Sequence, residues 1–370
     1  PVDGHDVEAL TQSLQWAREQ RCPVLLHVRT VKGKGYTPAE ERPADYHGVS
    51  PFDPATGKPL RTAKMDFSHV FGQELTALAG EDGRVCAITA AMQEGTGLTE
   101  FARKYPDRLF DVGIAEGHAV SMAGGMAKQG LVPVFAVYSS FLQRGYDQLL
   151  QDVALDGLHV VLGVDRAGLV GADGETHHGC FDTLYLSQVP HMTVLCPASF
   201  AELRQMLRRA VLELTGPVAV RYPRGGEGAY QGCCGGESFT QVRPGADCTI
   251  LTYGVLINEA LAAAELLHEA GIETRVVKLN AIAPLDGDAV LAALGSEKRL
   301  LVLEDCVGSG CVGQRLTAIL AQRGRMPERL ILKNLGDTIP CHGTVPQLYA
   351  QCGLDAASVA AALKEACHEQ

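Results

Sequence analysis

Short runs of β-branched and other apolar residues alternate along this chain with Ala- and Leu-rich stretches of helical spacing. Strands and helices that alternate in this way form parallel sheets with helices on both faces. Between residues 65 and 226, the runs expected to form strands are RVCAIT, RLFDVGI, VPVFAVY, HVVLGVD, MTVLCP and PVAVRYP. The pattern therefore predicts an α/β fold, with a doubly wound and mostly parallel sheet in this part of the chain.

The same alternation continues in a second segment, residues 247–370. It begins with the run CTILTYG and a helix whose apolar positions recur at helical spacing, and the runs ETRVVKL and RLLVLED are expected to complete a smaller sheet. Glu304, Asp305 and His342 follow strands or turns here, where helix capping and surface polarity explain them. We interpret this domain as serving packing and dimerisation.

Residues 1–35 show one more helix and strand. Val7, Leu10 and Leu14 have the spacing of one helix face, and the strand-like run PVLLHVRT follows. We interpret this segment as the last helix and strand of a third domain. Residues 36–64 contain five prolines, and residues 227–246 are glycine-rich and almost without pattern, so both are predicted to be linkers. Two doubly wound βα domains in series are expected, preceded by the tail of a third.

Composition excludes several classes of function. The net charge is -11 at pH 7 without a basic block, which argues against a nucleic-acid partner. No apolar run reaches the roughly 18 residues of a membrane span, and no signal peptide is visible, so a cytoplasmic protein without membrane contact is expected. The twelve cysteines form no C-x-x-C pair and fall mostly in apolar runs. Core positions are therefore favoured over disulfides or a zinc site.

Polar residues gather directly after the predicted strands of the first domain. They are Glu116, Tyr138, Asp165, Arg166, Asp173, His177, His178 and Arg224, and the aromatic Phe141 lies among them. Ligands of open parallel sheets bind beyond the carboxyl ends of strands, which favours an active site at this edge. Each member alone has a simpler explanation: Glu116 would stabilise the start of the next helix by about 0.3–1 kcal/mol, and the two histidines can belong to a surface loop.

Several motifs of the chain resemble one family. The chain contains DVGIAEGHAV, VYSSFLQRGYDQ, DRAGLVGADGETHHGCFD, RYPRG and LED followed by GSG. These closely resemble the 1-deoxy-D-xylulose-5-phosphate synthases, a thiamine-diphosphate-dependent family of the transketolase superfamily. The resemblance covers the full chain, and the loop DRAGLVGADGETHHG is its most specific part. It implies a pyrimidine-binding domain over residues 65–226 and a transketolase C-terminal domain over residues 247–370.

The resemblance implies how the cofactor is bound. In this superfamily, a glutamate at the place of Glu116 binds the ring nitrogen of the aminopyrimidine and so helps to activate the thiazolium carbon. Its apolar neighbours, Ile114 among them, would desolvate the carboxylate and border the cofactor. Phe141 would stack on the pyrimidine, although from the residues alone an ordinary core aromatic is the simpler explanation. Arg144 would lie near the same ring.

The resemblance also implies the substrates, pyruvate and glyceraldehyde 3-phosphate. Arg166, Arg224 and Tyr138 would hold the phosphate, a role suited to forked guanidinium donors. Pyruvate would lose carbon dioxide, and its remaining two carbons would join the aldehyde to give 1-deoxy-D-xylulose 5-phosphate. This product is a precursor of isoprenoids, thiamine and pyridoxal.

Three residues would act near the reacting atoms. Asp173 and His177 would contact the hydroxyl and the aldehyde of the acceptor, and a histidine can shuttle a proton near neutral pH. His47, in the motif DYHG, would reach the site from the linker.

Two features depart from the family pattern. Gly117 stands where many members carry glutamine, and no GDG motif followed by an asparagine is found anywhere. That motif holds Mg²⁺ against the diphosphate through acidic and amide ligands. We therefore expect no metal site in this chain, which we interpret as the carboxyl-terminal portion of a longer, homodimeric enzyme. The N-terminal diphosphate-binding portion of that enzyme would supply the Mg²⁺ and diphosphate ligands.

Two alternatives remain open. The chain can be a separate pyrimidine-binding subunit, as in two-part transketolases or 2-oxoacid dehydrogenases, although residues 1–35 argue against this. It can also be a catalytically silent assembly module. One observation argues against silence through loss of site residues, namely the presence of Glu116, Arg166, Asp173, His177 and Arg224.

Overall fold

The structure is a computed structural model that describes residues 1–370 except 44, 50, 61–64, 234–236, 296–297 and 369–370. Its contacts divide the chain into two compact units, residues 1–64 and 65–370, and each is described by itself. Among the helices of the described residues, none is both long and apolar enough to cross a membrane.

The first unit holds one long helix and two very short strands. Helix α1 (Val7–Glu19) begins at Asp6, whose side chain accepts a hydrogen bond from the Ala9 N–H at 3.0 Å. Strand β1 (Val2–Asp3) pairs in parallel with β2 (Val28–Arg29), and α2 (Thr37–Glu41) follows. The predicted helix is confirmed, whereas the predicted strand is limited to β2. The exposed apolar residues of α1 include Trp16, which is 57% exposed.

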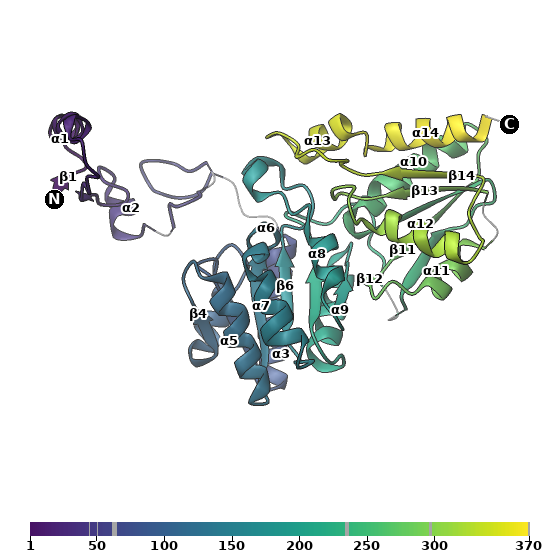
Figure 1. The fold of residues 1–370 in the computed structure, drawn as a ribbon, viewed down its shortest axis with the longest axis horizontal. Coiled ribbons are helices and arrows are strands. Elements are labelled where there is room, and N and C mark those ends of the chain that lie inside the picture. The colour runs from purple at the N-terminus through teal and green to yellow at the C-terminus, as the bar shows by residue number, and fades with distance from the viewer. Residues whose placement is uncertain (44, 50, 61–64, 234–236, 296–297, 369–370) are drawn as a thin grey trace. The chain divides into compact units, whose positions relative to one another are not determined.

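The second unit begins with a seven-stranded sheet in the order β12-β7-β8-β6-β5-β3-β4. Figure 1 labels β6 within this sheet and β4 and β12 at its two edges. Its strands are β3 (Val85–Thr89), β4 (Leu109–Asp111), β5 (Val132–Tyr138), β6 (Val161–Asp165), β7 (Thr193–Leu195), β8 (Val218–Arg221) and β12 (Ala281–Ala283). All neighbours are parallel except β12, which comes from the later segment and pairs antiparallel with β7. The six strands predicted between residues 65 and 226 are therefore confirmed.

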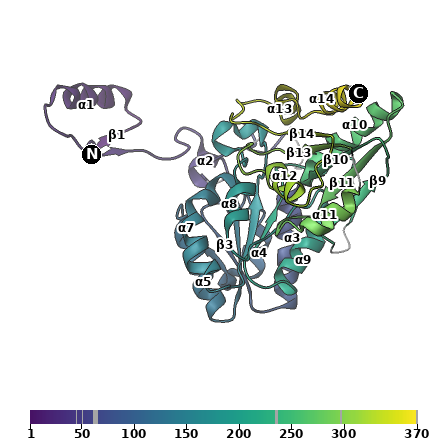
Figure 2. The same cartoon turned by 45° about the vertical axis from the view of Figure 1, so that its right-hand side comes forward.

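Helices cover both faces of this sheet (Figure 2). They are α3 (Phe67–Glu81), α4 (Thr99–Lys104), α5 (Glu116–Lys128), α6 (Ser139–Leu142), α7 (Tyr146–Gln148), α8 (Asp182–Gln188) and α9 (Phe200–Leu212). Alternate residues of β5 belong to different cores: Val134 packs with α3 and α9, and Phe135 packs with α5. A strand buried on both faces reads as a continuous apolar run, which is why this one could be predicted.

The later segment forms a five-stranded sheet in the order β14-β13-β10-β11-β9. Its strands are β9 (Phe239–Arg243), β10 (Cys248–Tyr253), β11 (Thr274–Leu279), β13 (Arg299–Leu303) and β14 (Arg329–Lys333). Its helices are α10 (Ile257–Glu269), α11 (Gly287–Leu294), α12 (Val312–Gln322), α13 (Val345–Cys352) and α14 (Ala356–His368). The predicted α/β class, with two sheets in series, is confirmed.

Two expectations about this segment are wrong. The sheet is not complete with three strands, because β9 and β14 flank it. Residues 227–246, expected to be a patternless linker, contain the antiparallel edge strand β9. Both missed strands lie at sheet edges and are only partly buried. Thr240 and Gln241 interrupt the apolar run of β9, and the apolar run of β14 is only three residues long.

The described cysteines are all free. Cys86, Cys196, Cys248 and Cys306 are buried in the core, as their apolar surroundings predict, whereas Cys22 is exposed. Burial raises the pKa of the Cys86 thiol to about 11. A protonated buried thiol behaves as a small core residue.

Candidate active site

The polar residues predicted at strand ends come together at one edge of the seven-stranded sheet. Tyr138 is the last residue of β5, Arg166 directly follows β6, and Glu116 opens the helix after β4. Because these strands are parallel and in register, their carboxyl ends meet at one edge. A continuous set of contacts links these residues to Phe141, Arg144, Asp173, His177 and Arg224.

Glu116 is a buried carboxylate with one charged partner. It is the first residue of α5 and is 2% exposed, and Arg144 Nη1 donates a hydrogen bond to its Oε1 at 3.1 Å. The Arg144 side chain is 60% exposed. Ile114, which was expected to border the cofactor and desolvate Glu116, is 80% exposed. The burial of Glu116 therefore comes from other neighbours.

The glycine at position 117 does not disturb this helix start, since α5 begins regularly at Glu116. A Cβ atom at Gly117 would lie 3.3 Å from the side chain of Gln148. This separation is tighter than ordinary van der Waals contact, so a larger residue here requires Gln148 to move.

Phe141 lies between three other site residues. Its ring stacks on that of Tyr138, with centroids 5.6 Å apart, and meets the His177 ring edge-on at 5.3 Å. The Arg144 guanidinium carbon lies 5.6 Å from its centroid. Phe141 is partly buried and also packs against the hydrophobic core, so its stacking on the pyrimidine stays a prediction.

Arg166 and Arg224 converge on one carboxylate. The Nε atoms of Arg166 and Arg224 lie 3.4 Å and 3.3 Å from Asp173 Oδ2. Arg166 Nη1 also donates to the Gly95 carbonyl at 3.0 Å, and its guanidinium carbon lies 3.7 Å from the Tyr138 ring centroid. Two guanidinium groups held close together form a site for an anion.

The backbone of Arg166 is strained. Its φ is 59°, in the left-handed region that residues other than glycine rarely adopt. Such a conformation costs of order 1–3 kcal/mol and persists only where the surroundings enforce it. This backbone conformation directs the Arg166 side chain toward Tyr138 and Gly95, and the contacts of its guanidinium with them hold it there.

Beneath the arginines lies a buried carboxyl group to which the sequence assigned no role. Asp165 is fully buried, and its Oδ2 accepts a hydrogen bond from the Ser68 hydroxyl at 2.7 Å. Its Oδ1 lies 3.3 Å from Arg166 Nη1. Burial raises the pKa of Asp165 to about 6, against the opposing effect of Arg166. Ser68 is 97 residues away in the chain, and no sequence pattern indicates this pairing.

Asp165→Asn is expected to change how stability depends on pH. The folded chain holds the Asp165 proton more tightly than the unfolded chain, since its pKa is about 6 instead of the usual 3.8. This residue's contribution to stability is therefore fully present below pH 4 and is lost as pH rises to about 6, a change of about 3 kcal/mol. Urea unfolding measured between pH 4 and pH 8 should show that the free energy of unfolding of the wild type falls relative to that of the variant as pH rises to about 6. A constant difference between the two proteins contradicts the raised pKa.

The two adjacent histidines have different surroundings. His177 is partly exposed, and its Nδ1 lies 2.9 Å from the Thr176 hydroxyl. His178 is buried, and its Nδ1 accepts a hydrogen bond from the Val170 N–H at 3.2 Å. Burial lowers the pKa of His178, which keeps it neutral as an acceptor within the loop. His47 belongs to residues 1–64, and its role stays a prediction.

In the later segment, helix capping is confirmed as the explanation for Glu304, whereas surface polarity is wrong as the explanation for Asp305. Glu304 is buried and accepts hydrogen bonds from the Val312 and Gly313 N–H groups at 2.8 Å, so it caps α12. Asp305 is only 3% exposed and bonds to Arg221 of β8, so it is no surface residue. The sequence did not indicate Arg221 or its second partner, Asp182.

In the part of the chain that the structure describes, no cluster of three or more His, Cys, Asp or Glu residues could hold a metal ion.

The sheet edge offers two kinds of binding group. One is the buried carboxylate of Glu116 beside the partly exposed ring of Phe141, and the other is an arginine pair suited to an anion. These are the groups needed to bind a heterocyclic base and a phosphate next to each other.

Comparisons with known proteins point to one superfamily. The family models described as "Transketolase, pyrimidine binding domain" and "Transketolase, C-terminal domain" match residues 63–226 and 238–359. The 1-deoxy-D-xylulose-5-phosphate synthases of Desulforudis audaxviator and Pelotomaculum thermopropionicum are both 44% identical to the chain, covering 96% and 99% of it. The chain spans 56% and 58% of the lengths of these two relatives.

Solved structures show the same fold. One entitled "Split gene transketolase, inactive beta4 tetramer" has a TM-score of 0.72 and 25% identity, and the match covers 81% of this chain and 97% of that one. A transketolase from Pichia stipitis has a TM-score of 0.69 at 15% identity, over 83% of this chain and 46% of its own. At that identity the likeness concerns the fold alone.

Proposed function

Because the chain belongs to the 1-deoxy-D-xylulose-5-phosphate synthase family of the transketolase superfamily, we propose that it carries the pyrimidine-binding half of a thiamine-diphosphate site. In this site, pyruvate and glyceraldehyde 3-phosphate are condensed to 1-deoxy-D-xylulose 5-phosphate. One observation carries the proposal: a continuous set of contacts joins buried Glu116 to the arginine pair at the same sheet edge.

The residues around Glu116 suit the aminopyrimidine of the cofactor. A buried carboxylate can share a proton with a ring nitrogen, and the partly exposed ring of Phe141 offers a flat apolar surface for stacking. Arg144 keeps the carboxylate in place through its 3.1 Å hydrogen bond. When bound, the cofactor would supply a nucleophilic carbon for pyruvate and a positively charged ring that takes up the electron pair released as carbon dioxide leaves.

The described residues contain no cluster of His, Cys, Asp or Glu suited to Mg²⁺, and the motif that carries the family's ligands for Mg²⁺ and the diphosphate is not found in this sequence. We propose that a diphosphate-binding portion outside these residues supplies them. Two facts support this: the curated relatives are longer than the chain, and the split-gene structure that resembles it is entitled an inactive β4 tetramer. The homodimer expected from the resemblance stays a prediction.

Arg166 and Arg224 suit the phosphate of glyceraldehyde 3-phosphate. Both guanidinium groups already lie within 3.4 Å of one carboxylate oxygen of Asp173, and a phosphate presents three acceptor oxygens instead. The Tyr138 ring lies against Arg166 and limits its movement.

In the proposed reaction, the bond between the carboxylate carbon and the carbonyl carbon of pyruvate breaks, and carbon dioxide leaves. A new carbon–carbon bond forms to the aldehyde carbon of the acceptor, whose oxygen takes up one proton. His177 is the candidate donor of this proton, since it shares a loop with Asp173 and its ring meets that of Phe141.

Equilibrium binding of thiamine diphosphate with Mg²⁺ tests this division of the site. We expect tight binding only when the chain is combined with the diphosphate-binding portion of the enzyme, because neither half holds both ends of the cofactor. Isothermal titration calorimetry on the chain alone and on the combined portions provides the comparison. Equally tight binding by the chain alone contradicts the half-site, and no binding by the combination contradicts the cofactor assignment.

A further inference from the structure

The loop that carries Asp173 and His177 packs against the C-terminal domain. Gly168 and Gly171 have φ angles of 76° and 66° and allow close approach of this domain. A Cβ atom on Gly168 would overlap the Asp305 carboxylate, and one on Gly171 would lie 3.0 Å from the Gly343 carbonyl oxygen. The Val307 N–H donates to the Cys180 carbonyl at 3.1 Å. The domain interpreted as serving packing and dimerisation thus contacts the loop of the candidate site.

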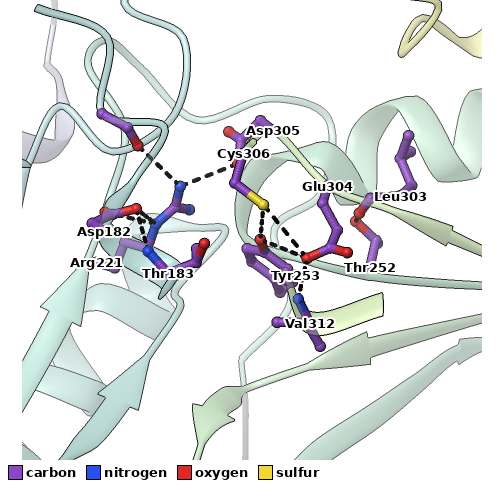
Figure 3. A network of polar contacts seen from close by, with 11 residues as sticks. Asp182, Thr183, Arg221, Thr252, Tyr253, Leu303, Glu304, Asp305, Cys306 and Val312 are labelled. Carbon is purple, nitrogen blue, oxygen red and sulfur yellow. Dashed lines mark hydrogen bonds and ion pairs between the residues drawn. The ribbon is translucent and has the colours of Figure 1, made fainter. Parts of the chain in front are cut away.

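A buried polar network crosses between the two domains at this point (Figure 3). Arg221, at the end of β8, donates from Nε to both carboxylate oxygens of Asp182, at 3.0 Å and 2.9 Å. Its Nη2 donates to Asp305 Oδ1 at 3.2 Å. Arg221 is 4% exposed, Asp182 1% and Asp305 3%. Two carboxylates therefore share one guanidinium away from water.

Arg221 and Asp305 of this network contact the base of the loop, where its two ends meet. Gly168 and Gly179 exchange two backbone hydrogen bonds of 2.8 Å, which close the loop at its base. Arg221 Nη2 also donates to the Gly179 carbonyl at 3.5 Å, while the Asp305 carboxylate fills the space beside Gly168. The two partners of the cross-domain ion pair thus touch the two ends of the loop.

We propose that Arg221 and Asp305 are positioning residues, through which the C-terminal domain holds loop 168–179 in the shape that places Asp173 and His177. Burying three charges is costly, and apolar residues of similar size often serve stability equally well. Burial raises the pKa of Asp182 even with Arg221 beside it, which reflects this cost. The directed hydrogen bonds of these charged groups fix the geometry of the loop base. The kinetic part of this inference rests on the proposed function, whereas the order of the loop does not.

A second buried ion pair offers a matched control. Lys278 Nζ, on β11, lies 3.1 Å from Glu202 Oε2, on α9, and both side chains are 0% exposed. This pair also joins the two domains. The Glu202 carboxylate also accepts hydrogen bonds from the Ala198 N–H and the Tyr230 hydroxyl, both at 2.8 Å, and neither belongs to the loop. A purely structural role predicts equal effects for the two pairs.

Hydrogen exchange measured by mass spectrometry on the 370-residue chain tests the order of the loop. Asp305→Asn keeps the side-chain shape and an oxygen that can accept from Arg221, but it removes the charge that strengthens this hydrogen bond. Asp182 stays bonded to Arg221, so the fold should persist. We expect exchange in a peptide covering residues 168–179 to rise about tenfold or more, and to change less than about twofold in Glu202→Gln. If Asp305→Asn does not fold, Arg221→Lys provides the test, because lysine keeps the charge but cannot reproduce the forked contacts.

Kinetics of the complete enzyme test the consequence for the substrate. The same loosening should raise the KM for glyceraldehyde 3-phosphate about tenfold in Asp305→Asn and leave the KM for pyruvate unchanged. Unchanged loop exchange, equal loosening by Glu202→Gln, or a loosened loop with an unchanged acceptor KM each overturns the positioning role. An enzyme that does not use these substrates overturns the proposed function, while the exchange result still decides the role of the ion pair.

Discussion

Glu116→Gln is expected to lower the kcat of the complete enzyme by about 10²- to 10⁴-fold, the usual contribution of a group that moves a proton in the transition state. Glutamine has nearly the same shape and keeps an oxygen that can accept the hydrogen bond from Arg144, so the buried site is not emptied. It cannot take up and release a proton at the pyrimidine nitrogen. Steady-state turnover, with circular dichroism as a check on folding, measures the effect.

Asp111 provides the matched control for this variant. It lies at the end of β4, and its Oδ1 accepts hydrogen bonds from the Ala91 and Gly113 N–H groups at 2.9 Å. An asparagine oxygen can accept both, so Asp111→Asn should keep turnover within about threefold of the wild type. Near-normal turnover of Glu116→Gln, or an equal loss in the two variants, contradicts the role proposed for Glu116.

Arg224→Ala is expected to raise the KM for glyceraldehyde 3-phosphate by about 10- to 100-fold, the effect of losing a charge-assisted hydrogen bond of about 1.5–3 kcal/mol. The KM for pyruvate should not change, because pyruvate carries no phosphate. Initial rates with each substrate varied in turn give the two constants.

A phosphate-free acceptor separates this effect from a general disturbance of the loop. Arg224 also donates to the Val170 carbonyl at 3.3 Å, so its loss can affect the loop as well as the phosphate. With glyceraldehyde as the acceptor, Arg224→Ala and the wild type should have similar kcat/KM values. An equal penalty with both acceptors shows that the phosphate is held elsewhere.

Buried strands of the fold were predictable, whereas edge strands were not. β5 and β6 are buried on both faces and appear as continuous apolar runs. In β9, Thr240 and Gln241 interrupt the apolar run, whereas the apolar runs of β14 and β12 are only three residues long. Runs this short also occur in loops, and only pairing with a neighbouring strand makes these segments part of a sheet.

The residues of the candidate site were predictable to the extent that parallel topology dictates them. Polar residues after parallel strands must meet at one edge, which is why Glu116 and Arg166 could be named before their contacts were known. The two arginines of the motif RYPRG could not be told apart in this way. Its first arginine, Arg221, is buried between two domains, whereas the side chain of Arg224 is 39% exposed beside Asp173. Sequence alone gives both residues the same charge and nearly the same place.

Partners that are far apart in the chain account for most of what was missed. Ser68 bonds to Asp165 across 97 residues, and Arg221 bonds to Asp305 across 84. Serine and aspartate are common on protein surfaces, so neither has a local pattern that marks it as buried. Only the packing of the two domains brings these groups together and excludes water from them.

The most direct test of the proposed function is product formation by the complete enzyme supplied with thiamine diphosphate, Mg²⁺, pyruvate and glyceraldehyde 3-phosphate. The arrangement of Glu116, Phe141 and the arginine pair predicts cofactor-dependent release of carbon dioxide, with an equal amount of 1-deoxy-D-xylulose 5-phosphate formed. Omission of either substrate should abolish the product. Transfer of a two-carbon unit from a ketose phosphate, without any use of pyruvate, would contradict the proposal.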